Sequence, residues 1–177
     1  NKEILSNINK TFTKALSEDQ GLLPPSTEWL LDNYHIVDDQ IISVKYDLTL
    51  GFYKDLPKLK SGPLRGFPRI YLIALELLTH SDNRLTRDLI NEFILAYESV
   101  SPLTSAELWA FPIMLRLVLI ENLKRVMEKS KNTYHKRKTA RVWGQRLIKL
   151  KSLFADQIFY QLEKTFKSNK NPDPLFL

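Results

Sequence analysis

The sequence has no cysteine, only five glycines among 177 residues, and no long apolar run. Without cysteine there can be no disulfide framework, no thiolate metal site and no cysteine nucleophile. The longest apolar stretch covers residues 108–120 and is interrupted by Arg116, whereas a membrane-spanning helix needs about 20 apolar residues. The apolar content of 44% is nevertheless too high for a disordered chain, so the sequence predicts a folded protein with a real core.

Recognisable catalytic motifs are missing as well. There is no glycine-rich phosphate loop and no Gly-x-Ser-x-Gly turn that would present a nucleophile. An Asp-x-Asp pair, which would hold the metal of a nucleotide-sugar transferase, is also absent. No side chain can be assigned as a nucleophile beside its base. We therefore expect no catalytic residue and no cofactor in this segment.

Strand-like alternation is absent too, and apolar residues instead recur at steps of three and four, as they do on one face of a helix. This spacing predicts helices over residues 3–16, 28–48, 69–79, 86–100 and from 104 onward. Ser26 or Thr27 can cap the second helix, and Thr104 with Glu107 has the spacing of a capping box. The expected fold class is an all-α compact bundle of about six or seven helices.

Residues 51–68 interrupt the helical pattern. They include three of the five glycines and three of the nine prolines, but also six large apolar residues. Because a flexible linker would be polar, we expect one long ordered Gly/Pro-rich loop with fixed turns. Residues 1–168 are expected to form a single helical domain, and residues 169–177 a loose tail.

The last part of the chain leaves two helical arrangements open. One long helix after residue 104, or two helices with a break near residues 130–133, fit the apolar spacing equally well. Pro112 lies beyond the first turn of this segment, and a proline inside a helix removes a hydrogen bond. We therefore expect a kink at Pro112.

The formal net charge of +6 is unevenly distributed. Between Lys124 and Lys151 there are eleven Lys or Arg residues and one acid, whereas residues 1–123 have 12 basic and 16 acidic residues. Such a basic helix can bind an anionic lipid surface or an acidic partner, or it can simply be solvated. Nucleic acid ranks lower, because the consecutive cations 136–138 point around a helix. The expected basic surface comprises Lys124, Arg125, Lys136, Arg137, Lys138 and Arg141.

Polar residues inside the helical pattern suggest two further sites. Asp32, His35 and Asp39 share one helix face and could chelate a divalent metal, although a solvated face is the simpler interpretation. We therefore predict no metal site, with these three residues as weak candidates. Arg116 lies within an apolar run, and a buried arginine must be paired. We expect a buried ion pair with an acid from another helix.

Aromatic residues could form a ligand-binding or docking surface, since their rings stack on sugars and anchor interfaces. Aromatic residues at helical spacing more often belong to the core, and that alternative stays open. We expect residues 51–68 to pack against the helix that carries Trp29 and against Trp109, whether this makes a core or a docking surface. The candidate ligand or docking surface consists of Trp29, Tyr53, Phe67, Arg69 and Trp109.

Three sequence blocks stand out by their order and spacing. The first covers residues 29–35 and 38–41, and the second residues 53–59, 62–64, 66 and 68–71. The third covers residues 97, 103–104, 107–110, 115–116 and 121–125. Together they resemble the N-terminal region of bacterial cyclic β-1,2-glucan synthases. The resemblance extends over residues 22–126, whereas the basic stretch and the C-terminal segment match nothing named.

The resemblance implies a large inner-membrane parent enzyme that polymerises glucose from UDP-glucose and cyclises the chain. In that family the transferase motifs and membrane spans follow this region, so no catalytic residue transfers to this chain. The resemblance implies a non-catalytic helical domain on the cytoplasmic side of the inner membrane, which assembles or regulates the transferase by protein contact. Two alternatives stay open: a carbohydrate-binding module for the glucan, and a nucleic-acid- or lipid-binding domain that uses residues 124–151.

Overall fold

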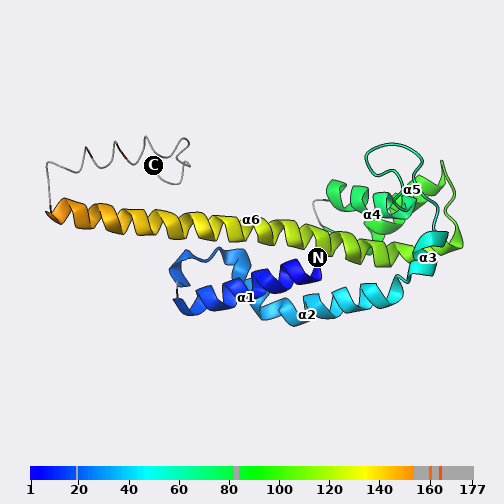
Figure 1. The fold of residues 1–177 in the computed structure, drawn as a ribbon. Helices are drawn as coiled ribbons and strands as arrows, with labels where there is room; N and C mark the ends of the chain where they lie inside the picture. Colours follow the sequence, from blue (N-terminus) through cyan, green and yellow to red (C-terminus); the bar gives the residue numbers. More distant parts are fainter. Residues whose placement is uncertain (19, 82–83, 154–159, 161–163, 165–177) are drawn as a thin grey trace. The chain divides into compact units, whose positions relative to one another are not determined.

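The computed structural model describes residues 1–18, 20–81, 84–153, 160 and 164, and in these residues it contains six α-helices (Figure 1). The expected all-α class is confirmed, with no strand other than an isolated bridge between Lys58 and Pro68 in the described part. The expected loose tail, residues 169–177, lies outside the described residues. The helices are α1 (Lys2–Glu18), α2 (Pro25–Asp47), α3 (Leu50–Asp55), α4 (Arg69–His80), α5 (Arg87–Glu98) and α6 (Ser105–Leu153).

Threonine side chains cap the starts of α3 and α5, whereas α4 begins after Pro68 without a side-chain cap. Thr86 caps α5 by accepting a hydrogen bond from the backbone N–H of Leu89 at 3.2 Å. The prediction that Ser26 or Thr27 caps α2 is wrong. This helix begins at Pro25, so both residues lie within its first turn. Proline is favoured at the first helical position, where its missing N–H costs nothing.

Helix α6 continues for 49 residues, from Ser105 to Leu153. It has no break at residues 130–133, so the single-helix alternative is confirmed. The helix also continues through Pro112, and the kink expected there stays a prediction. No helix in the described part of the chain combines the length and the apolar content that a membrane span requires.

The described residues divide into two compact units, which are considered separately. Unit 1 consists of residues 1–6 and 32–126, and unit 2 of residues 7–31 and 127–177. Helices α1, α2 and α6 each contribute residues to both units. The single domain expected over residues 1–168 therefore stays a prediction.

The core of unit 1 lies between α4 and the first half of α6, with Leu56 from the preceding loop. Apolar side chains of α5 are only partly buried and pack against this cluster. Burial of one large aliphatic side chain stabilises a fold by roughly 1.5–3 kcal/mol, so this cluster holds α4 against α6. Its buried members include Ile70, Ile73, Ala74, Leu77, Leu78, Ala110, Met114 and Val118.

The ordered loop expected over residues 51–68 is present in part. Residues 50–55 instead form the short helix α3, which was not predicted. The remainder turns at Gly62 and Gly66, whose φ angles of 83° and 87° favour glycine. The backbone N–H groups of Leu59 and Gly66 each donate a hydrogen bond across the loop at 2.9 Å, which fixes its turns.

The core of unit 2 is formed by buried residues of α1, α2 and α6. The ring of Phe12 meets that of Tyr134 edge to face, with centroids 6.4 Å apart. The Oγ atoms of Ser26 and Ser130 lie 2.9 Å apart, which joins the start of α2 to α6. Met127, Ser130 and Tyr134 thus form a buried stripe on the otherwise basic helix.

Candidate functional site

A partly buried ion pair, between Arg69 and the fully buried Glu107, joins the start of α4 to the start of α6 in unit 1. Arg69 donates to both carboxylate oxygens of Glu107, from Nε at 2.9 Å and from Nη2 at 2.7 Å. It also donates to Ser101 Oγ at 2.7 Å and to the carbonyl of Pro102 at 3.1 Å. The guanidinium group therefore fixes the loop between α5 and α6 as well as the two helices.

Glu107 takes part in the ion pair and in the capping box at the same time. Its carboxylate accepts from the backbone N–H of Thr104 at 2.9 Å, and its own N–H donates to Thr104 Oγ1 at 3.3 Å. Burial alone would raise the pKa of Glu107, but the hydrogen bonds from Arg69 and Thr104 outweigh it and hold that pKa below its usual value. The expected capping box is therefore present, and Arg69 serves this structural cluster.

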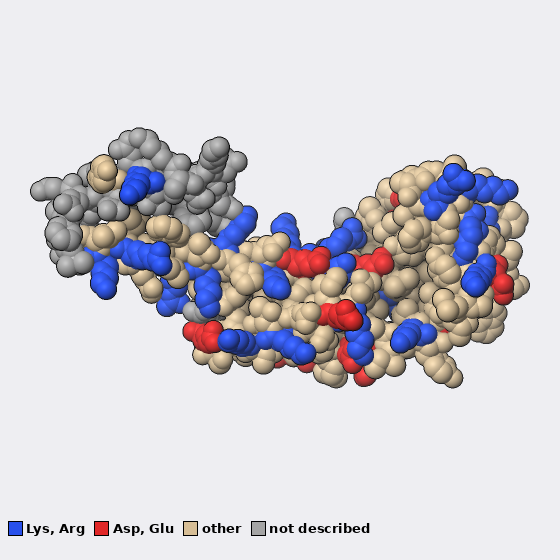
Figure 2. All heavy atoms as spheres, in the orientation of Figure 1, with Lys and Arg blue, Asp and Glu red and all other residues tan. Residues whose placement is uncertain are grey.

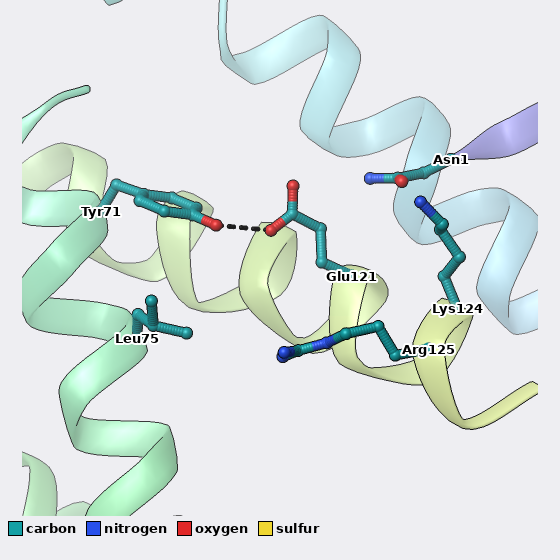
Figure 3. Close-up of a pocket in the computed structure, with 6 residues that line it drawn as sticks. All are labelled: Asn1, Tyr71, Leu75, Glu121, Lys124 and Arg125. Carbon is teal, nitrogen blue, oxygen red and sulfur yellow. Dashed lines mark hydrogen bonds between the residues drawn. The ribbon is translucent and has the colours of Figure 1, made fainter. Parts of the chain in front are cut away.

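Unit 1 also contains a pocket between α4 and α6 (Figure 3). The cavity has a volume of about 250 Å³. Figure 3 shows Tyr71 and Leu75 projecting from α4, with the charged side chains of α6 opposite them. The residues that line the pocket are Asn1, Tyr71, Leu75, Glu121, Lys124 and Arg125.

One short hydrogen bond organises the pocket. The hydroxyl of Tyr71 donates to Glu121 Oε2 at 2.6 Å. Burial, together with this hydrogen bond, raises the pKa of Tyr71 to about 12, so the hydroxyl keeps its proton at neutral pH. Only one oxygen of Glu121 is used by Tyr71, and Figure 3 shows the other pointing away from the ring.

Sequence reasoning missed this pocket. Tyr71 with Leu75, and Glu121 with Lys124 and Arg125, have the spacing of one helix face, but so do many pairs in an amphipathic helix. Nothing in the sequence pairs position 71 with position 121. Lys124 and Arg125 were expected on a basic surface, and the structure places both at the pocket.

Arg116 forms an ion pair with an acid of another helix, as its position in the apolar run indicates. Its Nη2 donates to Asp47 Oδ2 at 2.9 Å and its Nη1 to Ser43 Oγ at 2.8 Å, both on α2. The side chains of Arg116 and Asp47 are 32% and 33% exposed, so the ion pair is partly buried, whereas a buried pair was expected.

The aromatic candidates are divided between the two units and differ in exposure. In unit 1, Tyr53 packs against the core with Lys58 over its ring, and the rings of Phe67 and Tyr71 lie 5.4 Å apart. Trp109 is instead 79% exposed, which corrects the prediction that residues 51–68 pack against it. Trp29 belongs to unit 2 and is 53% exposed.

The acidic stripe on α2 lies in solvent. Asp32, His35 and Asp39 are all exposed. No group of three or more such side chains in the described part of the chain is arranged to hold a metal ion. The solvated-face interpretation therefore fits these residues, and the weak metal candidates are not brought together as a site.

Basic side chains gather along the second half of α6 (Figure 2). Lys136, Arg137 and Arg141 are exposed, as expected for a basic surface. Lys138 is only partly exposed and forms an ion pair with Glu18 of α1, with the two charged atoms 3.7 Å apart. This part of α6 thus has a buried side, with Met127, Ser130 and Tyr134, and an exposed side that carries cations.

Fold and site together define an all-helical protein segment in which charged clusters join neighbouring helices. No protein-family model matches the chain. It is 35% identical over 150 residues to the cyclic beta-(1,2)-glucan synthase NdvB of Rhizobium meliloti (strain 1021). The match covers 84% of this chain but spans only 5% of the length of that relative. The chain is therefore similar to one segment of a cyclic β-1,2-glucan synthase, which confirms the resemblance in the sequence. The matched 150 residues are more than residues 1–126 contain, so the similarity also takes in part of the basic stretch, and the expected limit of the resemblance is corrected.

Proposed function

We propose that this chain is a non-catalytic helical part of a glucosyltransferase related to cyclic β-1,2-glucan synthases. It acts by contact with the remainder of that enzyme, on the cytoplasmic side of the membrane. One observation carries the proposal: the match takes in most of this chain but a small fraction of the relative. A segment of that size within a large enzyme is suited to assembling or regulating the parts that carry out transfer.

Exposed apolar side chains of unit 1 support a contact role. Trp109 is 79% exposed and Val100 is 88% exposed, at the start of α6 and just after α5. Large apolar residues, and tryptophan above all, provide much of the binding energy when an interface covers them. Leu95, also exposed at 66%, adds to the apolar surface of the same unit.

Co-purification with a truncated synthase tests this proposal. The partner is a cyclic β-1,2-glucan synthase from which the segment matching this chain has been deleted, and the tagged 177-residue chain is the bait. We expect the two to co-purify, and Trp109→Ser with Val100→Ser to weaken the association at least about tenfold. Ile148→Ser is the matched control, because Ile148 is 72% exposed but lies in unit 2. Equal binding by all variants would contradict the role of this surface.

The exposed cations of α6 favour a second candidate function, contact with an anionic membrane surface. Lys136, Arg137 and Arg141 lie close together on one exposed stretch of helix. Each basic residue near an anionic bilayer contributes about 1 kcal/mol, and salt weakens the attraction. Sedimentation with phosphatidylglycerol vesicles should therefore decrease with added salt and with replacement of these three residues by Gln. Binding that is equal on neutral phosphatidylcholine vesicles would argue against this function.

A further inference from the structure

The pocket between α4 and α6 has no part in the contact role proposed above, yet its polar groups converge on one small space. Lys124 and Arg125 supply several N–H donors, and the amide of Asn1 supplies donors and an acceptor. Glu121 supplies an acceptor through the carboxylate oxygen that Tyr71 does not use. The pocket therefore offers donors and acceptors together.

This combination identifies the class of ligand. A hydroxyl group both donates and accepts, so a ligand rich in hydroxyls can satisfy donors and acceptors on the same wall. A phosphate or carboxylate would be attracted by Lys124 and Arg125, but it would also meet the carboxylate of Glu121, which repels it and which an anion cannot satisfy as an acceptor. Leu75 adds an apolar patch against which the C–H face of a sugar ring can pack.

The hydrogen bond from Tyr71 holds the carboxylate of Glu121 in place. Because Tyr71 is 8% exposed and its ring is packed in the core, the phenolic oxygen has a fixed position. The 2.6 Å hydrogen bond then orients Glu121 without neutralising its charge. Tyr71 is thus a positioning residue, and Glu121 is the acceptor that a ligand would meet.

The volume limits how much of a ligand can enter. Typical pockets for drug-sized ligands measure about 300–1,000 Å³, and this cavity measures about 250 Å³. We propose that the pocket binds a single sugar ring, with Glu121, Lys124 and Arg125 as its hydrogen-bonding groups. This proposal deepens the assignment to a glucan-forming enzyme, since the ring would then be a glucosyl unit, but sugar binding does not depend on the docking role.

Titration of the ¹⁵N-labelled 177-residue chain with glucose, followed by NMR, tests the proposal. We expect saturable shifts confined to backbone amides around Leu75, Glu121 and Arg125. Lys124→Gln and Arg125→Gln should each raise the Kd about tenfold, the loss expected for one charge-assisted hydrogen bond. Lys60→Gln is the matched control, because Lys60 is an exposed lysine of unit 1 away from the pocket lining, and it should leave the Kd unchanged.

A parallel titration with inorganic phosphate separates a sugar site from an anion site. For a sugar site, Glu121→Gln weakens glucose binding, because a carboxylate is the stronger acceptor, and phosphate gives no saturable shift. Phosphate binding that is tighter than glucose binding and is strengthened by Glu121→Gln would overturn the proposal. Absence of a saturable shift with glucose would also overturn it, whether or not the chain co-purifies with a truncated synthase.

Discussion

At the residue scale, Arg69 and Glu107 determine how α4 meets α6. Glu107 has no exposed surface, and its charge is balanced by two hydrogen bonds from one guanidinium group. Arg69 also binds the loop that precedes α6 through Ser101 and Pro102. The core cluster of unit 1 lies between the same two helices.

Arg69→Ala should lower the free energy of unfolding by about 3 kcal/mol or more, because Glu107 would stay buried without a partner charge. Urea denaturation followed by circular dichroism measures the change. Replacing both residues by Ala should recover part of the loss, since no unpaired charge is then buried. If Arg69→Ala lowered the free energy of unfolding no more than Lys60→Ala does, Arg69 would not stabilise the contact between α4 and α6.

The lowered pKa of Glu107 predicts a dependence of stability on acid. Because the pKa is lower in the folded than in the unfolded state, the stabilisation is present above the unfolded-state value of about 4.3. It is lost as the pH falls through the folded-state pKa. The difference in stability between wild type and Glu107→Gln, from urea midpoints at pH 7 and pH 3 to 4, should therefore shrink in acid. A constant difference would contradict this assignment.

Residue-level contacts are also where sequence reasoning had least information. Periodicity placed Arg116 in an apolar run and indicated an acidic partner, but the identity of Asp47 required the structure. Tyr71 and Glu121 are 50 positions apart, and their hydrogen bond arises only when α4 packs on α6. A pattern in a single sequence reports which face of a helix is apolar, and it carries no information on which helix covers that face.

At the scale of elements, apolar spacing predicted the five longer helices. It did not predict where α2 begins, nor the short helix α3. Four of the predicted helices correspond to α1, α2, α4 and α5, and the segment from residue 104 to α6. The start of α2 was placed too late, because Ser26 and Thr27 were expected as caps. Proline is favoured at the first helical position, and the helix begins at Pro25. The six-residue helix α3 was missed because it is too short to show a period.

Two glycine substitutions separate backbone strain from helix propensity. A side chain at Gly66 would meet nothing within 4 Å, yet its φ of 87° is unfavourable for other residues. Gly66→Ala should therefore destabilise the chain by about 1–2 kcal/mol. Gly144 lies inside α6 with equally open surroundings, so Gly144→Ala should stabilise by about 0.5–1 kcal/mol.

Thermal or urea denaturation of both glycine variants provides the comparison. Opposite signs for the two substitutions are expected, because neither introduces a clash and only Gly66 has a positive φ. If both variants were equally stable, the turn at Gly66 would not be a fixed feature of the loop over residues 56–68. Stabilisation by Gly144→Ala would also support a continuous helix through residue 144 of α6.

At the scale of the whole molecule, charge is best described segment by segment. The net charge of +6 suggested a basic protein, but residues 1–123 have an excess of acids. Some cations of the basic stretch have local roles, since Lys124 and Arg125 line the pocket and Lys138 pairs with Glu18. Lys136, Arg137 and Arg141 of α6 are exposed, and they are the residues on which the proposed contact with an anionic membrane depends.

The central claim is that this chain assists a glucosyltransferase without transferring glucose itself. Glucan formation from UDP-glucose tests it most directly, measured for the chain alone, for a synthase lacking the matching segment, and for the two combined. We predict no glucan from the chain alone, little from the truncated synthase, and recovery when they are mixed. Glucose transfer by the chain alone, or full activity of the truncated synthase without it, would contradict the claim.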